Sequence, residues 1–308
     1  MNKAILALTI MSMTLFGCQK VECEAPEMGP DVFTAEVDDF NEMTRTSMTA
    51  ERKVIWSKDD RIAVFKNSTA ATEYVLCFGA ETSRGAFEAV ELDDSENPTF
   101  TAGFEIKCNI AVYPYAKGLR LKGNGLGSAE KFYKIEGFSL PMTQTYTADS
   151  FANGAFPMVA VTEKVTDNEF FFSNVLGALK LSLKGALKVK SITVEGKNGE
   201  KLSGAAAVTV YASNQFPAIV MLSEASTEVT LDCGDGVSLN SNEAKNFFIA
   251  LPPVVFEKGF TVTITDSEGA EHILESTVSN TVDRSSILVM PEKVLSRANG
   301  RSIRCVQE

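Results

Sequence analysis

Side chains suited to acid–base, nucleophilic or metal chemistry are few in this chain. It has one histidine, His272, so a three-histidine zinc site is impossible and any Ser-His or Cys-His device would have to use this residue. His272 lies inside a predicted strand, next to Ile273, and we expect it on the strand surface. The sequence has no GxSxG elbow and no HExxH motif. We therefore expect no enzyme, no catalytic residue, no metal and no cofactor.

Two loops contain weak motifs. "KGNGLGS", residues 122–128, is glycine-rich like a phosphate loop, but it lacks the Lys-Ser/Thr ending, and no helix is expected after it. "ELDDSENP", residues 91–98, is rich in carboxylates and could hold Ca²⁺ weakly, but it lacks the ligand spacing and the glycine turn of an EF-hand. We interpret the first as a mobile loop and the second as a solvated acidic loop.

The most specific chemistry lies in "LFGCQK", residues 15–20. Lys3 supplies a positive charge, residues 4–16 form a short apolar run, and Gly17 precedes Cys18, which is the pattern of a secretory signal. The stretch resembles the bacterial lipobox, which implies cleavage between Gly17 and Cys18 and acylation of the Cys18 thiol. Two or more acyl chains anchor a protein stably, since each buried methylene contributes about 0.8 kcal/mol. The alternative is a plain signal peptide with a chance cysteine.

The other cysteines do not suggest a disulfide framework. Their number is odd, their spacing is wide and no CxxC occurs: Cys23, Cys77, Cys108, Cys233 and Cys305. Cys77 and Cys108 sit in apolar strand-like runs, and we expect both to be buried thiols.

The charge of the chain excludes some partners. With 29 Lys and Arg against 40 Asp and Glu, the net charge is −11, so the protein has no electrostatic reason to bind nucleic acid or anionic lipid. No apolar stretch reaches the roughly 20 residues that a membrane-spanning helix needs.

The elements that would position these residues are predicted to be strands. "GALKLSLKG", residues 177–185, alternates with Leu179, Leu181 and Leu183 on one face, as in a half-buried antiparallel strand. "SITVEGKNGEKLSG", residues 191–204, predicts a hairpin about Asn198-Gly199. "TVTITDSEGAEHILEST", residues 261–277, predicts another near Gly269. No segment keeps a helical apolar period over three turns.

Composition divides the chain into five predicted segments. They are a lipoprotein signal peptide (1–17), a flexible tether (18–30), an N-terminal β-sandwich domain (31–165), a C-terminal β-sandwich domain (166–296) and a polar tail (297–308). Polar, Thr- and Ser-rich sequence near residues 143–154 places the boundary close to residue 165.

Several stretches resemble the fimbrillin family of Bacteroidales type V pilin-like surface lipoproteins. "TRTSMTAERKVIWSKDDRIAVF", residues 44–65, is similar to the recurring N-terminal signature of that family. "LPMTQTYTADSFANGAFPMVA" resembles the segment that closes its first domain, and "NVLGALKLSLKG" and "NFFIALPPVVFEKGFTVTI" resemble parts of its second domain. The ordered set covers roughly residues 44–290.

The resemblance implies an all-β fold of two tandem transthyretin-like β-sandwich domains, held at the outer membrane and the cell surface by lipid on Cys18. It also implies cleavage after an arginine, here between Arg45 and Thr46. The freed strand would be "DVFTAEVDDF", with Phe33, Ala35 and Val37 on one face. A neighbouring fimbrillin-like subunit would then fill the gap by β-strand addition and build a head-to-tail fibre.

The C-terminal tail departs from this pattern. "SRANGRSIRCVQE" alternates apolar residues poorly, so it makes a weak donor strand. We therefore expect an anchor or accessory subunit of a fimbria, acting in adhesion, rather than a stalk subunit. The alternative is a non-polymerising surface lipoprotein that binds carbohydrate. Under either hypothesis the outer partners would be host or bacterial surface glycans or proteins.

Overall fold

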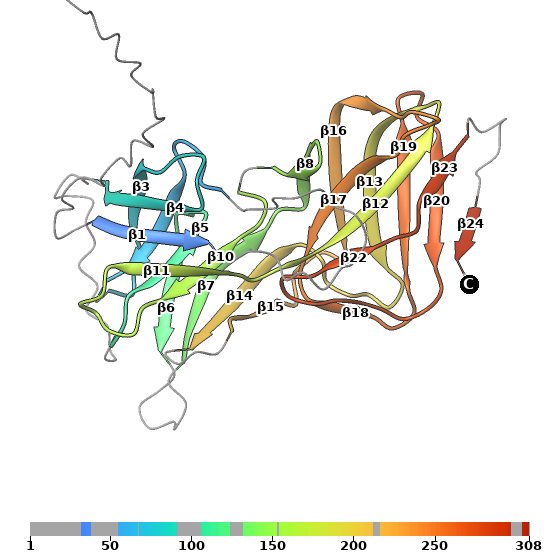
Figure 1. Ribbon diagram of the computed structural model, residues 1–308. Helices are drawn as coiled ribbons and strands as arrows, with labels where there is room; N and C mark the ends of the chain where they lie inside the picture. The colour runs from blue at the N-terminus through green and yellow to red at the C-terminus, as the bar shows by residue number, and fades with distance from the viewer. Residues whose placement is uncertain are drawn as a thin grey trace, which may run out of the picture. The chain divides into compact units, whose positions relative to one another are not determined.

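The computed structural model describes residues 32–37, 55–66, 68–90, 106–123, 132–152, 154–211, 216–296 and, for the backbone alone, 304–307. This part of the chain consists of strands, turns and loops without a helix, which confirms the all-β prediction (Figure 1). Accordingly, none of these residues belongs to a helix capable of crossing a bilayer.

The N-terminal strands form a closed barrel in the order β1-β11-β10-β5-β2-β3-β4. Its strands are β1 (Val32–Val37), β2 (Arg61–Phe65), β3 (Thr72–Phe78), β4 (Arg84–Ala89), β5 (Ile110–Tyr113), β10 (Met158–Val161) and β11 (Glu169–Asn174). Closure leaves no free sheet edge in the barrel, and this holds only because β1 pairs with both β4 and β11.

Strands β2, β5 and β10 are buried on both faces, which explains their continuous apolar sequences. In β2, Ile62 and Val64 point into the barrel core, whereas Ala63 and Phe65 belong to a second core outside the barrel wall. That second core is covered by a sheet of order β15-β14-β7-β6. Its strands are β6 (Arg120–Gly123), β7 (Phe132–Leu140), β14 (Gly204–Tyr211) and β15 (Ala218–Met221).

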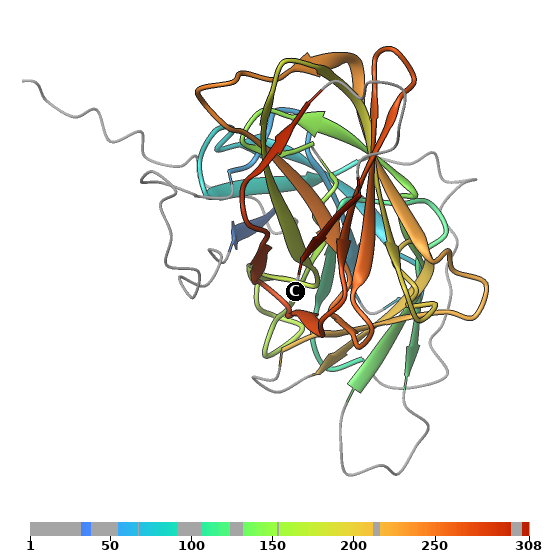
Figure 2. The same cartoon turned by 90° about the vertical axis from the view of Figure 1, so that its right-hand side faces the viewer.

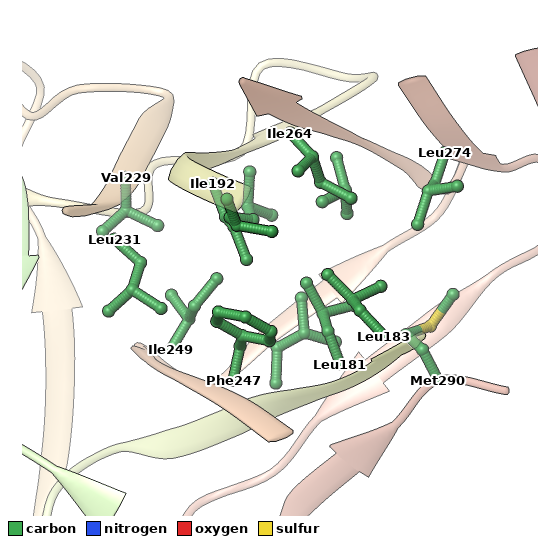
Figure 3. Packing of buried hydrophobic residues seen from close by; sticks show 14 of the residues in the cluster. Leu181, Leu183, Ile192, Val229, Leu231, Phe247, Ile249, Ile264, Leu274 and Met290 are labelled. Atoms are coloured by element: carbon green, nitrogen blue, oxygen red, sulfur yellow. The ribbon is translucent and has the colours of Figure 1, made fainter. Parts of the chain in front are cut away.

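The C-terminal part is a sandwich of two sheets. The larger has the order β24-β20-β19-β13-β16-β8-β9, and the smaller has the order β17-β12-β22, with β23 also paired to β12. Figure 3 shows Leu181, Phe247 and Ile249 of the smaller sheet pointing toward Ile192, Leu231 and other apolar side chains of the larger one. The sandwich core is therefore continuous between the sheets.

The strands of the sandwich are β8 (Thr143–Thr147), β9 (Ser150–Phe151), β12 (Gly177–Gly185), β13 (Lys188–Gly196), β16 (Glu228–Ser238), β17 (Lys245–Leu251), β19 (Phe260–Asp266), β20 (Glu271–Ser276), β22 (Ile287–Val289), β23 (Lys293–Leu295) and β24 (Arg304–Gln307). Strands β18 (Val254–Phe256) and β21 (Asn280–Val282) form a separate pair. The C-terminal strand β24 pairs in parallel with β20 at the edge of the larger sheet (Figures 1 and 2).

Strand pairing crosses residue 165 in both directions. The preceding strand β8 pairs with β16 of the sandwich, and the later strand β14 pairs with β7 of the sheet that covers the barrel. The side chain of Gln144 in β8 adds two hydrogen bonds, one to the backbone oxygen and one from the backbone N–H of Ala250 in β17. The domain boundary near residue 165 stays a prediction, and each core uses strands from both sides of it.

The hairpin predicted about Asn198-Gly199 is wrong. Strand β13, before the turn, has β16 and β19 as its neighbours, and β14, after the turn, pairs with β7 and β15. Gly199 does adopt the positive φ of 78° expected of a tight turn. Asn198-Gly199 does form a turn, but β16 and β19 already occupy both edges of β13, so the chain continues into a strand of another sheet. The hairpin near Gly269 is confirmed by the antiparallel pairing of β19 with β20.

Strand β12 differs in part from its predicted form. Leu179, Leu181 and Leu183 face the sandwich core as expected. The strand is antiparallel to β17 but parallel to β22 and β23, and Lys180 on its other face is buried, with its ammonium 5.9 Å from the centre of the Phe248 ring. Phe151 and Phe156 pack on this second face, which alternation within one strand cannot reveal.

The two cysteine predictions have different outcomes. Cys108 is buried, as expected, but Cys77 is exposed, and neither forms a disulfide. The pairing of β3 with β4 shifts register between Leu76 and Phe78, so a bulge at Cys77 breaks the alternation on which the prediction rested.

Candidate functional site

Strand β1 is the element that closes the barrel. It runs antiparallel to β4, with Val32 opposite Glu88 and Glu36 opposite Arg84, and parallel to β11. Two backbone hydrogen bonds extend this pairing. The Thr34 N–H donates to the Asn168 oxygen at 2.8 Å, and the Val37 N–H donates to the Ser83 oxygen at 3.2 Å. Figure 1 shows β1 lying between these neighbours as a short strand.

The inner face of β1 is the one expected from the sequence. Phe33, Ala35 and Val37 are 3%, 0% and 6% exposed, so the alternation of "DVFTAEV" identified the buried face. The Phe33 ring stacks on Phe170 with centroids 4.7 Å apart and meets Tyr74 edge-on at 5.4 Å. This strand therefore contributes side chains to the centre of the barrel core.

The tryptophan of the N-terminal signature holds the middle of β1. Trp56 is 1% exposed, and its indole Nε1–H donates to the backbone oxygen of Ala35 at 3.2 Å. Its ring also packs edge-on against Phe87 and Phe172, on the two strands that flank β1. The contact joins segments 21 residues apart, so local sequence patterns do not reveal it.

One ion pair spans the outer face of β1. The Arg84 guanidinium on β4 lies 2.6 Å from the Glu169 carboxylate on β11, on the two strands that flank β1. Both side chains are substantially exposed, so this pair contributes little to stability. Backbone pairing and buried side chains therefore supply most of the stabilisation of β1.

Removal of β1 would open the barrel. The paired edges of β4 and β11 would lose their backbone partners, and Phe170 and Phe172 would lose apolar cover. Unpaired backbone groups and exposed apolar surface are both costly, so the gap would favour any strand of matching alternation. The geometry is that of an acceptor groove already filled by a segment of the same chain.

Several predicted positions lie outside the described residues. These are the lipidation and cleavage residues Gly17 and Cys18, the candidate protease site Arg45 and Thr46, the acidic loop at 91–98 and most of the glycine-rich loop at 122–128. Of the candidate site residues, the structure places only Phe33, Ala35 and Val37, which it brings together on one strand.

His272 is not on the strand surface, contrary to expectation. It is 1% exposed, and its Nε2 lies 3.1 Å from Oδ2 of Asp266 across the β19–β20 hairpin. Burial acts to raise the pKa of Asp266, but hydrogen bonds from His272 and from the backbone N–H groups of Ala270 and Glu268 outweigh it, so this pKa is lowered. The pair closes a turn, and the described residues contain no group of three or more His, Cys, Asp or Glu that could hold a metal ion.

Tyr113 and Tyr115, at the end of β5 and just after it, pack against the cores. Tyr113 is 7% exposed, and its hydroxyl donates to Oδ1 of Asp60 at 3.1 Å, while Tyr115 is half-buried against the outer core.

Comparisons with known proteins give structural neighbours only. The chain matches no protein-family model and no curated protein. A solved candidate cell adhesion protein from Bacteroides uniformis is 15% identical, with a TM-score of 0.47 over 87% of this chain and 95% of its own. Another from Bacteroides ovatus is 14% identical, with a TM-score of 0.46 over 82% and 88%. The tip fimbrial protein Mfa3 from Porphyromonas gingivalis is 10% identical, with a TM-score of 0.32 over 79% and 80%.

Proposed function

We propose that this chain is a lipid-anchored, fimbrillin-like surface protein that acts in adhesion as an anchor or accessory subunit of a fimbria. In this proposal, proteolysis between Arg45 and Thr46 frees β1, and a strand from a neighbouring subunit replaces it. The observation that carries the proposal is the position of β1, which closes the barrel by pairing with β4 and β11. Arg45 follows β1 in the chain and precedes Trp56, so a single cut there would leave β1 held only by non-covalent contacts.

The physical logic of exchange follows from these contacts. A replacement strand would regain the backbone pairing of β1 and fill the pockets of Phe33, Ala35 and Val37 with alternate apolar side chains. Since a subunit that offers a groove and a strand makes a contact that does not close on itself, such contacts build fibres.

The C-terminal strand supports an anchor or accessory role rather than a stalk role. Within the part of the tail that the structure describes, strand β24 covers Arg304–Gln307 and pairs with β20 of its own sheet. A donor strand long enough to replace β1 would need to cover the six residues of that strand. An uncut subunit would stay at the outer membrane through acylated Cys18 and act as an anchor. A cut subunit would lose Cys18 together with β1 when a neighbouring strand replaces β1, and it would then act as an accessory subunit.

N-terminal mass spectrometry of the protein from intact cells tests the proposal. The wild-type protein should yield a new N-terminus at Thr46 in a surface fraction, together with an acylated Cys18 peptide from the uncut form. Arg45→Ala should abolish the first product, and Arg52→Ala, which changes another arginine of the signature, should not.

Electrophoresis in SDS without heating provides a second measurement. Strand-exchanged subunits should migrate as a ladder that collapses on heating, because exchange requires stripping a whole strand from a core. A chain that begins at Cys18 in every fraction and migrates only as a monomer would contradict the proposed cleavage and assembly.

A further inference from the structure

A cleft of about 480 Å³ lies on the barrel wall, away from the inner face of β1. It is lined by β10 and β11, by the connection between them, by the end of β14 and by the two residues before β15, including Glu163, Asp167, Phe171, Ser173, Tyr211 and Phe216. Its volume is typical of small-ligand sites, which combine apolar surface with a few polar groups.

Two phenylalanine rings of this cleft are unusually exposed. Phe171 is 62% exposed, because β11 turns Phe170 and Phe172 into the barrel and leaves Phe171 on the outer face. Phe216, just before β15, is also 62% exposed. Burying either ring would remove apolar surface from water, so both are available to a ligand.

The Phe216 ring is held in place from one side. The Arg284 guanidinium lies 4.1 Å from its centroid, and the same guanidinium donates to the backbone oxygen of Asn174 at 3.0 Å and to the Ser285 hydroxyl at 3.0 Å. A ring stacked on a fixed cation presents its opposite face outward, and such preorganisation lowers the entropic cost of binding.

The polar side of the cleft is also fixed. Buried Asn109 donates through Nδ2 to the backbone oxygens of Val165 and Asp167 at 3.1 and 2.9 Å. Thr162 bonds the backbone of Asn109 and of Lys164, and the Asp167 carboxylate accepts from Lys164 N–H. These bonds fix the connection that carries Glu163 and Asp167.

The charged side chains that line the cleft are the carboxylates Glu163, Asp167 and Glu169. Beside it, Arg84 pairs with Glu169 and Arg284 lies against Phe216. The carboxylates disfavour an anionic ligand, and the two arginines weaken the attraction for a cationic one. An uncharged ligand with many hydroxyl groups suits this mixture, since its hydroxyls can donate to carboxylates and its C–H faces can stack on rings.

We propose that this cleft binds a neutral glycan. The sugar rings stack on Phe171 and Phe216, and their hydroxyl groups donate to the carboxylates of Glu163 and Asp167. The exposure of both phenylalanines, the fixed Asn109-bound connection and the carboxylate acceptors beside the rings together carry the inference. The site goes beyond the proposed assembly, because no residue of β1 lines it.

A glycan array followed by isothermal titration of the full-length chain in detergent tests this assignment. The array presents neutral, sialylated and sulfated glycans, and the titration uses the free neutral oligosaccharide that binds best. We expect saturable binding to neutral glycans, and Phe171→Ala and Phe216→Ala should each weaken it about tenfold or more, the loss expected when a stacked ring is removed. Glu163→Gln should weaken it less.

Phe78→Ala is the matched control, because Phe78 is a 43% exposed ring on β3 that does not line the cleft. Absence of neutral-glycan binding, equal binding by Phe171→Ala and wild type, or preferential binding of a polylysine probe would each overturn the inference. Arg45→Ala separates the two proposals, since it should block strand release and leave glycan binding unchanged.

Discussion

Replacing Phe33 by alanine should be the most destabilising single change in β1. Phe33 is 3% exposed, stacks on Phe170 and meets Tyr74 edge-on, so no neighbouring side chain can fill its place without leaving these contacts. Deleting a buried phenylalanine ring costs about 3–5 kcal/mol, which includes the cavity that remains. We expect a loss of about 4 kcal/mol in the free energy of unfolding of the barrel, a large part of the typical 5–15 kcal/mol of a whole domain.

The chain provides its own reporter for this measurement. Trp56 is the single tryptophan and donates its indole N–H to Ala35 of β1, so its fluorescence follows the barrel. Equilibrium unfolding in guanidinium chloride, followed at this tryptophan, should show the Phe33→Ala transition shifted to much lower denaturant. Phe78→Ala, which removes an exposed ring from the same barrel, should change the free energy by about 0.5 kcal/mol or less.

A decrease below about 1 kcal/mol in the free energy of unfolding for Phe33→Ala would refute the reasoning, because removing a deeply buried ring costs more than that. It would mean that β1 does not fill the barrel core, and the proposed acceptor groove would then have no basis. The same variant should also release the β1 segment faster once the chain is cut after Arg45.

Three further predictions concern the hairpins and the cleft. The lowered pKa of Asp266 means that its contribution to stability is present above the carboxyl's unfolded value, near 4, and is lost as pH falls through the folded value. Urea unfolding at pH 7 and pH 3 should therefore show Asp266→Asn less stable than wild type at pH 7 and closer to it at pH 3; a constant difference would exclude this titration. Asn109→Ala should lower the free energy of unfolding by about 1–3 kcal/mol in chemical denaturation, since it leaves the backbone oxygens of Val165 and Asp167 without their hydrogen-bond donor. An unchanged midpoint would contradict these hydrogen bonds. Gly259→Ala should lower the midpoint of thermal unfolding much more than Gly269→Ala does. Both glycines have a positive φ, but the new Cβ at position 259 would lie 2.1 Å from the backbone oxygen of Ser276, whereas the space around Gly269 is open. Equal midpoints for the two variants would contradict this close approach.

The sequence predicted the strands better than their partners. Alternation identified the buried faces of β1 and β12 because those faces depend on period alone. It could not show that β13 and β14 belong to different sheets, since Asn198-Gly199 specifies a turn but does not require the strands on its two sides to pair with each other. Lys180 and His272 are buried for a similar reason: the groups they contact, Phe248 and Asp266, belong to other strands.

The candidate sites show the same division. The strand that fills the barrel could be named from its own residues, Phe33, Ala35 and Val37. The cleft could not, because Phe171 lies on β11, Phe216 lies just before β15, and only the fold places them beside Asp167. The signal available in the sequence was the triplet Phe170–Phe172, in which one ring of three must face away from the core.

The pairing of strands from opposite sides of residue 165 affects the order in which this protein can fold. The sheet that covers the barrel needs β14 and β15, and the sandwich needs β8. During synthesis, the first core therefore cannot be complete until residue 221 has been made. Folding that depends on such distant partners is slow, and it leaves strand edges open to wrong pairing meanwhile. A chaperone that shields those edges until residue 221 is available would benefit this chain more than it would benefit two modules joined end to end.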